Sequence, residues 1–141
     1  TPIKSSAASD VYKRQTLGSL KVSFYKGVPI FRKEYGFRSG SFLCILLAQG
    51  DTVDDLRHEW GHTVQQGILG ALKYGLTIGI PSWQDLGNKD YYDRPWEVTA
   101  DYYGGVEGRV HSNHNISAGI AYLALVAILG IMGTLFLIGE Y

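Results

Sequence analysis

The feature that most constrains this chain is a stretch of 24 residues near its end, Ile116 to Gly139, which contains no charged side chain. The stretch also lacks Asn, Gln, His and Pro, and its apolar side chains fall on every side of a helix rather than on one stripe. A helix of that length spans about 36 Å, enough to cross a hydrocarbon core about 30 Å thick. A chain of 141 residues is too small to surround such a helix. The pattern therefore predicts a transmembrane helix over 116–139 rather than a buried core helix.

The charges lie on one side of this stretch. All 13 Lys and Arg residues occur at or before Arg109, and only Glu140 follows the apolar stretch. The positive-inside rule then predicts a single-pass membrane protein whose polar part faces the cytoplasm, with the lipid bilayer as one partner. A lone cysteine, Cys44, and the lack of a signal peptide favour the same side. Because 13 acidic residues balance the bases, we expect no nucleic-acid partner, and the oligomeric state stays open.

The beginning of the chain reads differently from the rest. Residues 5–15, SSAASDVYKRQ, resemble a translated adapter remnant, and the only Met lies inside the apolar stretch. We therefore expect residues 1–15 to be a non-native or disordered leader, and the chain to be a fragment of a bacterial protein. The expected organisation is a polar domain over 16–110 followed by the membrane helix.

Three short segments have the patterns of strands. Residues 20–25 alternate apolar and polar side chains, residues 30–35 follow a Gly-Val-Pro turn, and residues 42–47 form a continuous apolar run. These segments predict a small antiparallel sheet in which 42–47 is a buried strand. With the helices that follow, they indicate an α+β fold.

The residues that indicate metal binding form an H-E-x-x-H motif, His58-Glu59-Trp60-Gly61-His62. It lies in a predicted helix that begins after Thr52, a residue with an acid three positions later as in a capping box. Residues four apart share a helix face, so His58 and His62 can both direct an imidazole at one metal ion. One Zn²⁺ ion suits such ligands and keeps a position open for water, from which Glu59 can take a proton.

A second predicted helix supplies the missing ligand. Its first turn holds Pro95, and Glu97 and Asp101 follow on one face of residues 96–103. We assign Glu97 as the third metal ligand and Asp101 as the acceptor for the outer N–H of a ligand histidine.

Other functions remain open at this point. The motif also occurs by chance on solvated helix faces, although two histidines and no lysine on the face favour a metal site. The main alternative is a non-catalytic, zinc-stabilised membrane interaction module.

The two motifs, H-E-x-x-H and the later E-x-x-A-D, resemble those of the gluzincin metallopeptidases, in particular the membrane-bound group of the CAAX-prenyl protease and the heat-shock protease HtpX. Residues 51–105 also resemble small uncharacterised bacterial proteins with HEYGH-type motifs. The resemblance covers roughly a third of the chain and implies a zincin-like helix pair in a metallopeptidase domain over 16–110 that hydrolyses peptide or protein substrates. The resemblance implies that zinc is bound by His58, His62 and Glu97. It also implies that Glu59 is the catalytic base and that Asp101 orients a histidine ligand.

The chain departs from that group in two respects. The gap from His62 to Glu97 is short, and one transmembrane helix is expected where the group has several, so substrate identity does not carry over. Hydrolysis also needs a donor to the oxyanion. The candidates are Tyr74, Tyr102, Tyr103, His111 and His114, and Gln65 is expected to line the cleft.

Overall fold

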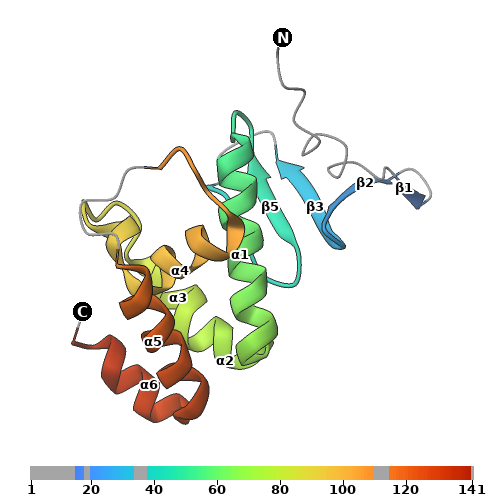
Figure 1. The fold of residues 1–141 in the computed structure, drawn as a ribbon. Coiled ribbons are helices and arrows are strands. Elements are labelled where there is room, and N and C mark those ends of the chain that lie inside the picture. The colour runs from blue at the N-terminus through green and yellow to red at the C-terminus, as the bar shows by residue number, and fades with distance from the viewer. Residues whose placement is uncertain (1–14, 18–19, 34–37, 110–114, 141) are drawn as a thin grey trace.

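The computed structural model describes residues 15–17, 20–33, 38–109 and 115–140 (Figure 1). The leader expected over 1–15 lies outside these ranges except for its last residue. The elements are, in order, β1 (Gln15–Leu17), β2 (Leu20–Tyr25), β3 (Val28–Lys33), β4 (Gly40–Ser41), β5 (Ile45–Ala48), α1 (Val53–Leu69), α2 (Ala71–Tyr74), the π-helix η2 (Gly75–Gly79), α3 (Ile80–Gln84), the 3₁₀ helix η3 (Tyr91–Asp93), α4 (Pro95–Gly104), α5 (Ile116–Ile128) and α6 (Ile131–Ile138).

The fold is α+β, but its sheet is mixed, with the strand order β1-β2-β3-β5-β4. The expectation of an antiparallel sheet is wrong at one pair, because β5 runs parallel to β3. Strand β5 lies between β3 and β4 in the sheet. It pairs antiparallel with the short β4, which forms the edge of the sheet.

The apolar run 42–47 is not one buried strand. Phe42 and Leu43 are 50% and 63% exposed, and Leu43 has a positive φ of 60°, so the run begins as a turn between β4 and β5. Only Ile45 and Leu47 point into the core, where they meet Leu56 of α1.

Helix α1 starts where the capping box predicts. The Thr52 hydroxyl accepts a hydrogen bond from the Asp55 backbone N–H, and the Asp55 carboxylate accepts one from the Thr52 N–H. Two of the free N–H groups of the first turn are thereby satisfied. The helix lies alongside β5 (Figure 1).

Helices α1 and α4 approach each other so closely that two glycines are required between them. A Cβ atom on Gly61 of α1 would lie 1.9 Å from the carbonyl oxygen of Ala100, and one on Gly104 of α4 would lie 2.1 Å from that of Arg57. This close packing sets the two motif-bearing helices against each other.

The expected transmembrane helix over 116–139 is wrong. The segment folds into α5 and α6, of 13 and 8 residues, which are about 20 and 12 Å long at 1.5 Å per residue. In the parts of the chain that the structure describes, no helix combines the length and the apolar character needed to cross a membrane. The prediction of a single-pass membrane localisation is corrected accordingly.

The break between α5 and α6 lies at Leu129, whose φ and ψ of −69° and 149° are extended. The amino group of Lys73 in α2 donates to the carbonyl oxygens of Ala127, at 3.0 Å, and of Leu129. A cation at the end of a helix satisfies carbonyl groups that have lost their helical partners. The lysine thereby stabilises the turn into α6.

Helix α5 packs on α4 and completes a second core. Gly119 fits against Thr99 and Pro95 of α4, with no room for a larger side chain. Tyr122, Leu123 and Val126 cluster with buried residues of the earlier helices, namely Tyr74, Ile78 and Trp96.

An ion pair fixes the start of α4. Arg94, the N-cap residue, donates from Nε to Asp85 at 2.7 Å and from Nη2 at 3.2 Å, which lowers the pKa of the Asp85 carboxyl. A lowered pKa stabilises the fold above the unfolded pKa of about 3.8, and this contribution is lost as the pH falls through the lower, folded value.

We expect Asp85→Asn to lower the free energy of unfolding by roughly 1 kcal/mol at pH 7 and by much less near pH 2. Urea unfolding of both proteins at the two pH values measures this. An equal loss at both values would contradict the ion pair as the cause.

Candidate metal centre

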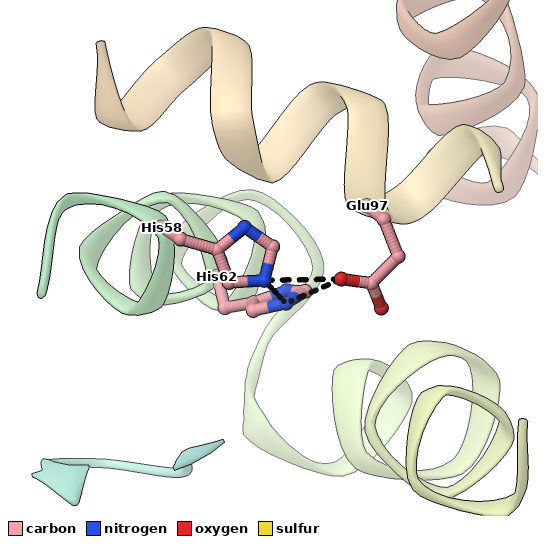
Figure 2. A group of neighbouring side chains, drawn as sticks. All are labelled: His58, His62 and Glu97. Carbon is pink, nitrogen blue, oxygen red and sulfur yellow. Dashed lines mark hydrogen bonds and ion pairs between the residues drawn. The ribbon is translucent and has the colours of Figure 1, made fainter. Parts of the chain in front are cut away.

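Three side chains from α1 and α4 converge on one point. The Nε2 atoms of His58 and His62 are 3.2 Å apart, and Oε2 of Glu97 lies 3.0 Å from the first and 3.3 Å from the second (Figure 2). Tetrahedral zinc with bonds of about 2.0–2.1 Å separates its ligand atoms by about 3.3 Å. The observed triangle thus has the dimensions of three corners of such a tetrahedron.

The outer ring nitrogen, Nδ1, of His58 and of His62 has a hydrogen-bond partner. Nδ1 of His58 lies 2.6 Å from Oδ1 of Asp101, and Nδ1 of His62 lies 2.8 Å from Oε1 of Gln65. The amide of Gln65 has a defined orientation, because its Nε2 donates to the carbonyl of Trp96 and the hydroxyl of Thr99. Both Nδ1 atoms therefore carry hydrogen, and in the neutral rings both Nε2 atoms present lone pairs.

Two lone pairs and a carboxylate oxygen facing one another repel unless a cation lies between them. Oε2 of Glu97 is buried and receives no hydrogen bond, and all three residues are less than 5% exposed. The His58, His62 and Glu97 group can therefore hold a metal ion.

In the ion-free protein a proton takes that place. Burial acts to lower the pKa of His58, but the carboxylates of Asp101, Glu97 and Glu59 outweigh it and raise the pKa to about 10. Burial likewise acts to raise the pKa of Glu97, yet the two histidines bring it well below its usual range. Metal binding must then displace a proton.

Asp101 is itself held by a residue that the motifs did not single out. Arg109 donates from Nη1 to Oδ1 of Asp101 at 2.8 Å and from Nη2 to Asp55 at 3.2 Å. Its guanidinium lies 4.0 Å from the centre of the Tyr92 ring, which makes a T-shaped contact with the His58 ring. Arg109 thus links both helices behind His58.

Glu59 faces a different side of the cluster. It lies with His62 in the wall of a cavity of about 110 Å³ and is 5% exposed, and its Oε2 receives no hydrogen bond. Burial raises the pKa of Glu59, while the nearby histidines oppose that shift. A buried carboxylate therefore lies beside the possible metal group and faces a cavity.

The structure selects among the other candidates. Of the proposed donors, Tyr74 lines the cavity, Tyr102 is half exposed, and Tyr103 packs against the second core. His111 and His114 lie outside the described residues. Gln65 does not line the cleft as expected, since it is fully buried against α4.

Sequence reasoning missed two residues of the cavity wall, Ser82 of α3 and Tyr91 of η3. Ser82 donates to Oε1 of Glu97 at 2.6 Å and lies 2.8 Å from the Tyr91 hydroxyl. No spacing or motif marks them, because they come from segments without helical or strand periodicity around them.

No family model, curated protein or solved structure matches this chain.

Proposed function

We propose that this protein is a zinc-dependent peptidase of the gluzincin type, in which His58, His62 and Glu97 hold one ion and Glu59 acts as the general base. The observation that carries the proposal is the buried triangle of Nε2 of His58, Nε2 of His62 and Oε2 of Glu97, beside a buried carboxylate that faces a cavity. A structural metal site does not need either the free carboxylate or the cavity.

A bound zinc ion supplies a Lewis acid and a water molecule whose pKa is lowered toward about 7. Glu59 accepts the proton of the attacking water and delivers it to the leaving amine. Asp101 and Gln65 keep the two histidine rings in the tautomer that presents Nε2 to the ion.

We assign to Tyr74, which lines the cavity, the role of stabilising negative charge on the substrate carbonyl oxygen. Burial raises the pKa of its phenol, so the hydroxyl keeps its proton at neutral pH. That proton has only a long hydrogen bond, 3.4 Å, to the carbonyl oxygen of Ser41. Such a donor is available to a developing oxyanion in the cavity.

The proposal is tested on the full chain with zinc alone and with an unbiased peptide library. We expect close to one equivalent of zinc, cleavage of library peptides, loss of cleavage on chelation and recovery when zinc is restored. Bound zinc without any cleavage would instead support a structural metal module, and a chain that binds no metal would overturn the proposal altogether.

A further inference from the structure

The carboxylate of Glu97 has two oxygens in different surroundings. Oε2 points at the two histidines, whereas Oε1 points away from them (Figure 2). Oε1 instead accepts a hydrogen bond from the Ser82 hydroxyl. Glu97 is fully buried, so water does not compete with these partners for the two carboxylate oxygens.

The direction of the hydrogen bonds follows from the number of protons. A carboxylate that binds a metal ion only accepts hydrogen bonds, so Oε1 of Glu97 takes its bond from the Ser82 hydroxyl. Ser82 has one hydroxyl proton and gives it to Oε1, so the 2.8 Å contact with Tyr91 must use the phenol proton.

We propose that Ser82, supported by Tyr91, is a positioning residue that occupies one oxygen of Glu97 and thereby limits this ligand to a single bond with the metal ion. Hydrogen bonds to an ionised group are about twice as strong as neutral ones, and this one is short. Three protein atoms and one water then make a four-coordinate site, whereas a carboxylate binding through both oxygens would raise the coordination number to five. The inference rests on the proposed metal site and assigns to Ser82 the control of its coordination number.

Cobalt(II) alone is the probe, because its visible absorption is intense in four-coordinate sites and weaker in five-coordinate ones. We expect the wild-type chain to give the intense spectrum and Ser82→Ala to give a weaker one. We further expect Ser82→Ala to hold the metal within about tenfold of the wild-type affinity, because a second carboxylate bond replaces the lost hydrogen bond; Asp101→Ala should weaken binding by roughly 10- to 100-fold.

Two variants serve as controls. Ser82→Thr keeps the hydroxyl and should restore the wild-type spectrum. Ser41→Ala removes the hydroxyl of another serine of the cavity wall, in β4, and should leave the spectrum unchanged.

An unchanged spectrum in Ser82→Ala, or a Ser82→Ala chain that binds no cobalt, would overturn the role of Ser82 while leaving the peptidase proposal standing. A weakened spectrum in Ser82→Thr would do the same. Failure of the wild-type chain to bind cobalt would overturn both proposals.

Discussion

Replacing Glu59 with glutamine is expected to lower peptide hydrolysis by about 10²- to 10⁴-fold while leaving the metal bound. The glutamine amide has nearly the shape of the carboxylate. Glu59 is not one of the three possible metal ligands, so the variant keeps all three of them. The amide cannot accept a proton from water, however. Metal content and kcat/KM measured on the same preparation separate the two effects.

The matched control is Glu107→Gln, the same chemical change at an exposed position outside the cavity wall. It should retain wild-type activity. Full activity in Glu59→Gln would remove the general base from the proposed mechanism, and loss of the metal in that variant would make Glu59 a ligand instead.

The second large effect is expected at Gly61. Ordinary contact for a Cβ atom begins at 3.4 Å, whereas a Cβ at this position would lie 1.9 Å from the Ala100 carbonyl oxygen, so Gly61→Ala must push α4 away by about 1.5 Å. Metal sites tolerate ligand displacements of about 0.2 Å. We therefore expect loss of tight metal binding and a free energy of unfolding lower by at least about 3 kcal/mol, or about 10 °C in Tm.

Gly67 provides the control within the same helix, because a Cβ atom there would meet nothing within 4 Å. Gly67→Ala should keep the metal and raise stability by about 0.5–1 kcal/mol, since alanine is the better helix former. Thermal unfolding and metal titration of both variants measure the contrast. Equal behaviour of the two would show that the contact between α1 and α4 is not what holds the ligands together.

The parts of the fold that local patterns determine were predictable. Thr52 and Asp55 set the start of α1, and the four-residue spacings of the two motifs place their side chains on one face. Convergence of the motifs depends on two helices passing in contact, and the sequence signals that contact only through small residues such as Gly61 and Ala100.

The parts that distant residues determine were not predictable. Between Ile116 and Gly139 only Gly130, directly after Leu129, marks the break, and glycine alone does not require one. The cation that satisfies the freed carbonyl groups, Lys73, lies more than fifty positions earlier. Hydropathy records only the apolar composition of that segment. The same limit applies to Ser82, whose partner Glu97 is 15 positions away, and to Arg109, which reaches Asp55 across 54 positions.

The packing of α5 on α4 has a consequence for how the molecule opens. Glu97 lies on the helix whose Trp96 belongs to the same apolar cluster as Tyr122 and Val126. Local unfolding of α5 and α6 would therefore expose α4, and we expect the two regions to unfold as one cooperative unit. An ion that binds only the folded state of the metal centre stabilises α4 and α5 together. Ion binding should therefore slow hydrogen exchange of α5 amide groups that do not contact the ion.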